Sequence, residues 1–377
     1  MSRPTKKISL LIFPTSPSII NEVKLSTINL LKKNGIAISQ IIIEKSFFSV
    51  YTKMTIKALR ILSSCLGIKK IELAYYTTNE DQSILDTIIK VGQKIVFNDK
   101  FYIKVYSENS NVVARDLEFV ATGLLIEKLA NKLSIPSSNE YNASKLIKVY
   151  IVKSHSYISF KFIEGIGGMV FGYLKKRVFI LVYDKYSLYC LKNMILSGFT
   201  PEIFILFWDY TDLKTKLHLI HNIINYTNMN KIKIQLLQLN FLFSNSKEVR
   251  DKYIISDYMI INICLYLNNL KDIVLPYNLL VHPVDLIESS FKMCIKEGRI
   301  PWFPCLYEDN IVKMFDENFE NMNSTFIFRK EFPDNYKERL TNKQRLLSLK
   351  KNIKTFYVKN KSLNIRPNYI DNILNSI

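Results

Sequence analysis

Glycine and acidic residues are scarce in this chain of 377 residues. It has ten glycines, and its 33 Asp and Glu face 52 Lys and Arg, which gives a formal net charge of +19. A neutral metabolic enzyme without an anionic partner is therefore not our first interpretation. A composition biased toward Lys, Asn and Ile explains part of this excess, but the shortage of acidic residues favours a surface that binds a polyanion.

Long apolar runs are also missing. The longest candidate, residues 253–267, contains Asp257, whereas a membrane span needs roughly 18 to 20 apolar residues. Near the N-terminus, the apolar stretch 8–13 is shorter than the core of a secretory signal. We therefore expect a soluble, cytoplasmic protein that has no membrane partner.

Cysteine pairs and histidine clusters are absent as well. The five cysteines, which form no C-x-x-C motif, are Cys65, Cys190, Cys264, Cys294 and Cys305. This usage is typical of a reducing compartment and supports neither a disulfide framework nor a conventional zinc site. We expect Cys294 and Cys305 to pack rather than react. His218 and His221 have a metal-binding spacing but no third ligand, so no metal is predicted.

Hydrophobic periodicity predicts an α+β first half. The first segment, residues 1–76, has the order β-α-β-β-α-β, which predicts a ferredoxin-like unit. Its expected strands are 7–13, 36–43, 47–51 and 71–76, and its expected helices are 21–33 and 56–66. The second segment, residues 77–168, predicts a small separate α+β domain. Its expected helices are 84–95 and 116–133, and its expected strands are 101–106, 147–152 and 157–162.

Strands and helices alternate regularly in the third segment, residues 169–330, and the fold class changes to α/β. The expected strands are 178–182, 202–207, 232–239 and 272–275, and the expected helices are 186–196, 213–225 and 248–267. This alternation is typical of a doubly wound parallel sheet, which binds its ligands at the carboxyl ends of the strands.

A basic tail, residues 331–377, follows the third segment. Residues 329–361 hold eleven Lys or Arg and three acidic residues. Part of the tail reads as an amphipathic helix that could lie along RNA or could dock on the sheet with its charges outside. Its basic side chains are Arg339, Lys343, Arg345, Lys350, Lys351 and Lys354.

Four of the ten glycines cluster within eight residues, where the fold class changes. They are Gly165, Gly167, Gly168 and Gly172. Such a cluster marks backbone that needs positive φ or a close approach, or a flexible interdomain hinge. The run Glu164-Gly165-Ile166-Gly167-Gly168, followed by Gly172, resembles the E-G-I-G-G-x-P-x-G-T junction of the tRNA 4-thiouridine synthetase family.

This resemblance extends over residues 1 to about 330 and implies a domain order. It implies a ferredoxin-like domain at 1–76, a THUMP RNA-binding domain at 77–168 and a PP-loop ATP-pyrophosphatase domain at 169–330. Asp116-Leu117-Glu118 and Gly123 resemble the THUMP core. In this family, ATP activates a tRNA uridine as an adenylate, and persulfide sulfur then replaces the oxygen.

The chain departs from the family where ATP should bind. The PP-loop S-G-G-x-D-S wraps pyrophosphate with backbone N–H groups, and its glycines permit the close approach. The corresponding stretch here is Tyr183-Asp184-Lys185-Tyr186-Ser187, which is one residue shorter and has no glycine. The two tyrosines add bulk and Asp184 adds a negative charge, although Lys185 and Ser187 could still contact an anion.

Two further family features are not recognisable. The family's cysteine near the end of the PP-loop domain has no clear counterpart, so the sulfur relay lacks a carrier. His282 and Asp285 lie near the position of further nucleotide contacts, but the local family motif is absent and a loop turn is the safer interpretation. We therefore predict a degenerate PP-loop domain without a cofactor, and ATP with Mg²⁺ only if activity persists.

The front half keeps interleaved basic and aromatic residues that could bind phosphates and stack bases. Each lysine could equally be a solvated surface charge. The candidate RNA-binding residues are Lys53, Lys57, Arg60, Lys104, Arg115, Lys145 and Lys148.

Three functions stay open from the sequence. The first is a THUMP-type tRNA-binding protein whose PP-loop domain serves as a scaffold, with an active sulfurtransferase subunit or a sulfur donor protein as a possible partner. The second is a tRNA sulfurtransferase that makes 4-thiouridine, alone or with a partner. The third is a protein-interaction subunit that does not touch RNA.

Overall fold

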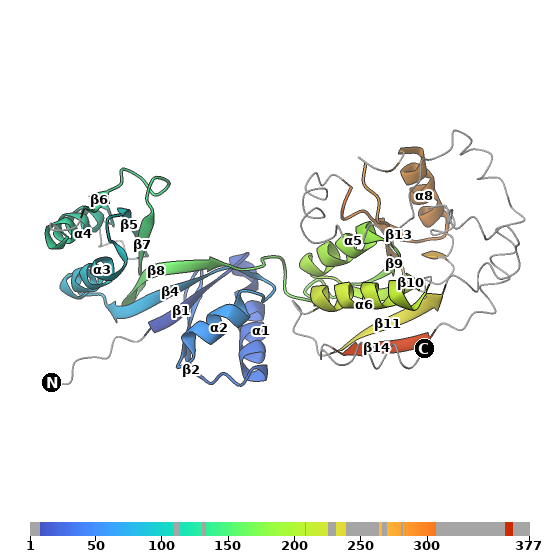
Figure 1. Cartoon of the computed structure of the whole chain (residues 1–377), viewed down its shortest axis with the longest axis horizontal. Helices are drawn as coiled ribbons and strands as arrows, with labels where there is room; N and C mark the ends of the chain where they lie inside the picture. Colours follow the sequence, from blue (N-terminus) through green and yellow to red (C-terminus); the bar gives the residue numbers. More distant parts are fainter. Residues whose placement is uncertain are drawn as a thin grey trace, which may run out of the picture. The chain divides into compact units, whose positions relative to one another are not determined.

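The computed structural model divides the chain into two compact units, Met1–Val170 and Phe171–Ile377 (Figure 1). The structure describes residues 8–108, 114–129, 133–207, 209–224, 231–238, 264–265, 270–279, 282, 284–306 and 359–364. The expected helix 248–267 and the basic tail helix lie outside the described residues, apart from Cys264 and Leu265, which are helical.

The first unit contains one mixed sheet of eight strands in the order β2-β3-β1-β4-β8-β7-β5-β6. The strands are β1 (Ile8–Pro14), β2 (Ile38–Ile43), β3 (Phe48–Thr52), β4 (Ile68–Thr78), β5 (Lys100–Ser107), β6 (Ile135–Pro136), β7 (Lys145–Ile151) and β8 (His155–Glu164). The helices are α1 (Ile20–Lys33), α2 (Thr55–Leu62), α3 (Asp81–Ile95) and α4 (Ala114–Lys128), and a 3-10 turn covers Pro17–Ile19.

Strand β4 joins the first two sequence segments into one sheet. It pairs antiparallel with β1 on one side and with β8 on the other. The two expected α+β modules therefore share a continuous set of backbone hydrogen bonds. The predicted domain boundary at residue 76 falls inside β4. The division into two domains at this residue stays a prediction.

The two faces of this sheet differ, as a strand period of two residues requires. Ile103 and Val105 of β5 lie in a buried cluster with residues of α3 and α4. Tyr106 of β5 belongs to the opposite face, where its ring stacks on Tyr150 of β7 at 5.2 Å between centroids. Apolar and aromatic side chains form a second buried cluster here, which includes Phe13, Phe47 and Tyr150.

The second unit contains a six-stranded sheet in the order β13-β12-β9-β10-β11-β14. The strands are β9 (Arg177–Val182), β10 (Thr200–Phe207), β11 (Lys231–Gln238), β12 (Asp272–Val274), β13 (Ile300–Trp302) and β14 (Lys359–Asn364). The helices are α5 (Lys185–Leu196), α6 (Tyr210–Ile224) and α8 (Val284–Lys296). Five strands are parallel and only β14 is antiparallel to its neighbour. The predicted parallel sheet is therefore confirmed.

The strand order fixes where a ligand would meet this sheet. From β9 the chain proceeds outward to β10 and β11, along which α5 and α6 lie in Figure 1. It then returns to the other side of β9 to form β12 and β13. The carboxyl ends of β9 and β12 thus flank the point at which the winding direction reverses, and ligands of open α/β sheets bind at such points.

The glycine junction is a structured segment. Gly67 donates its N–H to Gly167 O at 2.8 Å, and Gly167 donates to Ile68 O at 2.9 Å. The Thr15 hydroxyl donates to Gly168 O at 2.6 Å. Gly167, Gly168 and Gly172 all have positive φ. Residues 167 and 168 are therefore held against the first unit and do not form a loose hinge.

Some element boundaries differ from the sequence prediction. The expected helix 116–133 ends at Lys128, and the expected helix 56–66 ends at Leu62. Strands β6, β13 and β14 were not predicted, because strands of two or three residues carry no periodicity and β14 is strongly polar. No helix among the described ranges is long and apolar enough to span a membrane.

Replacement of Gly165 by alanine tests the junction. An added Cβ would lie 2.2 Å from the backbone oxygen of Ile68, so we expect Gly165→Ala to lower the free energy of unfolding of the first unit by about 2–4 kcal/mol. Denaturant unfolding followed by circular dichroism measures this. The matched control is Gly123→Ala on α4, where no described atom beyond the helix backbone lies within 4 Å. This control should raise stability by about 0.5–1 kcal/mol, and equal effects of both changes would contradict the close approach at Gly165.

Candidate functional site

The turn between β9 and α5 is closed by its own side chains. Ser187 Oγ accepts the backbone N–H groups of Tyr183 and Asp184, each at 3.0 Å. Asp184 Oδ1 in turn accepts the N–H of Ser187 at 2.8 Å, and the Ser187 hydroxyl donates to Asp184 O at 2.7 Å. This reciprocal capping at the N-terminus of α5 engages the amides of Tyr183, Asp184 and Ser187.

The sequence-predicted residues of this turn are mostly buried. Tyr183 is 2% exposed and packs in a core cluster with Phe179 and Tyr277. Asp184 is 6% exposed and Ser187 is fully buried. Tyr186 is half-buried, and its ring lies 5.9 Å from that of His282. The side chain of Lys185 lies outside the described residues.

A second aspartate caps the neighbouring helix. Asp209 Oδ1 accepts the N–H of Asp212 at 2.9 Å at the start of α6. One turn later, Lys216 Nζ lies 2.8 Å from Asp212 Oδ2 and donates to Leu206 O of β10, also at 2.8 Å. The Lys216 side chain is fully buried. This ion pair is not predicted from the sequence. The signal that could have revealed it is an Asp followed four residues later by a Lys, shortly after an expected strand.

These groups make the carboxyl edge of β9 and β10 acidic. Burial lowers the pKa of Lys216, and the nearby carboxylates of Asp212, Asp184 and Asp209 raise it. Three carboxylates therefore act on one ammonium group. Since Asp184 and Asp209 are helix caps, both N-terminal dipoles already face a negative charge.

The other side of the reversal point is packed by aromatic and amide groups. The buried rings of Tyr277 and His282 lie 4.9 Å apart. Asn278 donates its N–H to His282 Nδ1 at 2.9 Å and its side-chain amide to Cys305 O at 2.8 Å. His282 is thus part of a folded turn, as the sequence favoured, while Asp285 lies in the first turn of α8.

Metal-binding geometry is not found in the part of the chain that the structure describes. No group of three or more His, Cys, Asp or Glu side chains there could hold a metal ion. His218 and His221 lie three residues apart on α6.

In the first unit, three candidate RNA-binding residues share one exposed surface. Lys53 precedes α2, and Lys57 and Arg60 lie on the outer side of this helix. None of the three forms an ion pair within the described ranges. Met54 and Ile56, which are 49% and 66% exposed, lie between them in sequence. We call Lys53, Lys57 and Arg60 the α2 basic surface.

Two other candidates, Lys104 and Lys148, are paired with acidic residues. Lys104 Nζ lies 3.2 Å from Glu118, and this interaction raises the pKa of the lysine chiefly through the hydrogen bond. Lys148 lies 3.4 Å from Glu140 and 3.9 Å from the buried Glu72. The parallel pairing of β5 with β7 places Lys104 directly beside Lys148.

The remaining two candidates are Lys145, at the start of β7, and Arg115, on α4. Lys145 lies 3.6 Å from Asp99, and Arg115 is exposed in the first turn of α4. The acidic partners of the paired lysines are distant in sequence, so no local pattern could have revealed them.

Lys216→Met tests the buried ion pair. Removal of the ammonium leaves Asp212 buried without its cation, so we expect the free energy of unfolding to fall by about 3–5 kcal/mol. The exposed neighbour Lys214 provides the control, because Lys214→Met should change stability by less than about 0.5 kcal/mol. Urea denaturation of both variants measures the difference. A Lys216→Met protein as stable as the control would show that this pair does not hold the edge together.

Similarity to known proteins is found in structure and not in sequence. No family model and no curated protein matches the sequence. A crystal structure of a 4-thiouridine synthetase–RNA complex with bound ATP has a TM-score of 0.66 at 10% identity, and the match covers 95% of this chain and all of that one. PH1313 from Pyrococcus horikoshii has a TM-score of 0.60 at 14% identity, with 82% and 98% covered. At these identities, the likeness is one of fold.

Proposed function

We propose that this protein binds tRNA through a THUMP-type first unit, and that its second unit is a PP-loop fold that no longer binds ATP. The observation that carries the proposal is the closed turn of Tyr183, Asp184 and Ser187 at the end of β9. The fold resembles that of a protein whose structure contains both RNA and ATP. Of those two ligands, we expect this chain to bind RNA and not to bind ATP.

The loss of ATP binding follows from hydrogen bonds and charge. A PP-loop binds pyrophosphate with unoccupied backbone N–H groups at a helix N-terminus. Here a hydroxyl and a carboxylate accept the N–H groups of Tyr183, Asp184 and Ser187 at 2.8 to 3.0 Å. To bind a phosphate, the turn would have to break these bonds and place the ligand beside Asp184. Both steps oppose binding.

RNA binding is supported by charge and by the α2 basic surface. The chain carries a net charge of +19, and cations that neutralise phosphates dominate nucleic-acid affinity. Unlike Lys104 and Lys148, the three residues of the α2 basic surface have no acidic partner within the described ranges. They are thus, like the exposed Arg115, candidates whose charge is available to a phosphate. We assign the second unit a scaffold role, with a sulfur-transfer protein as its candidate partner.

Charge reversal of the α2 basic surface tests the RNA site. We expect Lys53→Glu/Lys57→Glu/Arg60→Glu to weaken tRNA binding about 10- to 100-fold at 0.15 M salt and to reduce the salt slope by about 2–3, since up to three phosphate contacts are lost. Filter binding at several salt concentrations measures both quantities.

A matched control separates this site from net charge. Lys214→Glu/Lys292→Glu/Lys296→Glu alters three exposed lysines of α6 and α8 by the same total charge. It should leave most of the affinity intact. An equal loss in both triple variants, or equal affinity of the native chain for tRNA and for an unstructured polyanion of the same length, would contradict a specific tRNA site.

ATP binding tests the second unit. Isothermal titration with millimolar Mg-ATP should give no saturable heat, with or without tRNA, because the amides of the β9–α5 turn are engaged. Pyrophosphate release should also stay at the background level. Saturable binding, or release that depends on tRNA, would instead support an ATP-dependent tRNA sulfurtransferase.

A further inference from the structure

Two cysteines that are far apart in sequence meet inside the second unit. Cys190 lies on α5, and Cys305 lies 115 residues later, just after β13. Their Sγ atoms are 2.8 Å apart, and both residues are fully buried. Each of the five cysteines of the chain is a buried thiol in the structure.

The backbone around Cys305 is held in place from two sides. Asn193, one turn after Cys190 on α5, directs its side-chain amide to Pro304 O at 3.4 Å and to Cys305 Sγ at 3.8 Å. Asn278 donates to Cys305 O at 2.8 Å. A disulfide needs its sulfurs about 2.05 Å apart. The two thiols therefore need to approach by less than one ångström, within a segment that is already fixed.

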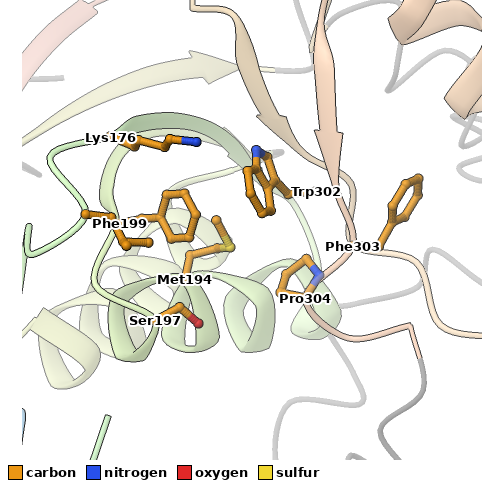
Figure 2. A pocket seen from close by; sticks show the side chains of 8 residues that line it. Lys176, Met194, Ser197, Phe199, Trp302, Phe303 and Pro304 are labelled. Carbon is orange, nitrogen blue, oxygen red and sulfur yellow. The ribbon is translucent and has the colours of Figure 1, made fainter. Parts of the chain in front are cut away.

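A cavity of about 400 Å³ is lined by residues close in the chain to both cysteines. Figure 2 shows the cavity between α5, which supplies Met194, and the segment of Trp302, Phe303 and Pro304. Met194 follows Cys190 by one helical turn, and Pro304 directly precedes Cys305. Chain neighbours of both cysteines thus line the cavity, while the two thiols themselves are buried behind its wall.

We propose that Cys190 and Cys305 form a site of reversible oxidative modification, at which a small peroxide converts the two thiols into an intrachain disulfide. One sulfur attacks the peroxide, the O–O bond breaks, and a sulfenic acid and water result. The second thiol then attacks the sulfenic sulfur, the S–S bond forms and a second water leaves. The two cysteines are oxidised by two electrons, and hydrogen peroxide is reduced to two water molecules. A dithiol reverses the step by exchange.

The bond would tie the strand end at β13 to helix α5. Asn278 links Cys305 to the turn that holds His282. Oxidation would therefore also fix one wall of the carboxyl edge described above. Cys65 lies in the other unit, and Cys264 and Cys294 belong to the core cluster of the second sheet.

Peptide mapping of the full chain tests the proposal. The native protein is treated with hydrogen peroxide, remaining thiols are alkylated, and the digest is analysed by mass spectrometry. We expect a peptide pair joined through Cys190 and Cys305 that has lost two hydrogens, is absent from untreated protein and disappears with dithiothreitol. The oxidised chain should also melt several degrees higher, because the bond closes a long loop in the unfolded state.

Variants provide the control. Cys65→Ser should keep the cross-linked peptide, whereas Cys190→Ser and Cys305→Ser should each abolish it. The mapping of the unmodified sequence needs no variant, so it decides the matter even if one variant does not fold. Cross-links that mainly join Cys264 to Cys294 or two separate chains would overturn the proposal, as would oxidation of Cys190 and Cys305 without a bond between them.

Discussion

A backbone N–H group at a helix N-terminus can be satisfied once, and in this protein that constraint decides the character of the second unit. In the β9–α5 turn, Ser187 and Asp184 take up the amides themselves. A glycine-rich loop does the reverse, since its glycines carry no side chains that could cap the amides, which stay available to a ligand. The same strand-to-helix connection can thus be a stable cap or an anion site, and its side chains decide which.

Acidic and basic side chains also hold the N-terminus of the neighbouring helix, α6. Asp209 caps α6 as Asp184 caps α5, and Asp212 and Lys216 form a buried ion pair within α6. Such a pair stabilises little by itself, but loss of one partner is costly because a charge remains in a medium that does not solvate it. Lys216 Nζ also donates a hydrogen bond to Leu206 O near the end of strand β10. The edge of the sheet is therefore consolidated by hydrogen bonds and an ion pair among its own residues.

Local patterns predicted the backbone well and the contacts poorly. The alternation of strands and helices after residue 177 could be predicted, because buried strands and amphipathic helices differ in the spacing of their apolar residues. The fixed glycines at 167 and 168 were also legible, because positive φ favours one residue type. The partners of Lys104 and Lys148, in contrast, come from α4 and from the segment before β7. Cys190 and Cys305 meet only because β13 lies two strands away from β9. Pairings of this kind depend on the tertiary fold and leave no local trace.

The two units also differ in how much sequence change their proposed ligands tolerate. Phosphate contacts from exposed side chains such as Lys57 and Arg60 need charge and reach, and a neighbouring lysine can replace a lost one at modest cost. A pyrophosphate cradle needs several amides to converge within tenths of an ångström, so a single capping serine or one added Cβ abolishes it. The ATP-bound 4-thiouridine synthetase structure has a similar fold at only 10% identity, over 95% of this chain. For the proposed function, a diffuse cationic surface should tolerate such sequence differences better than a convergent backbone site does, which fits a chain that has both a closed turn at Ser187 and an exposed α2 basic surface.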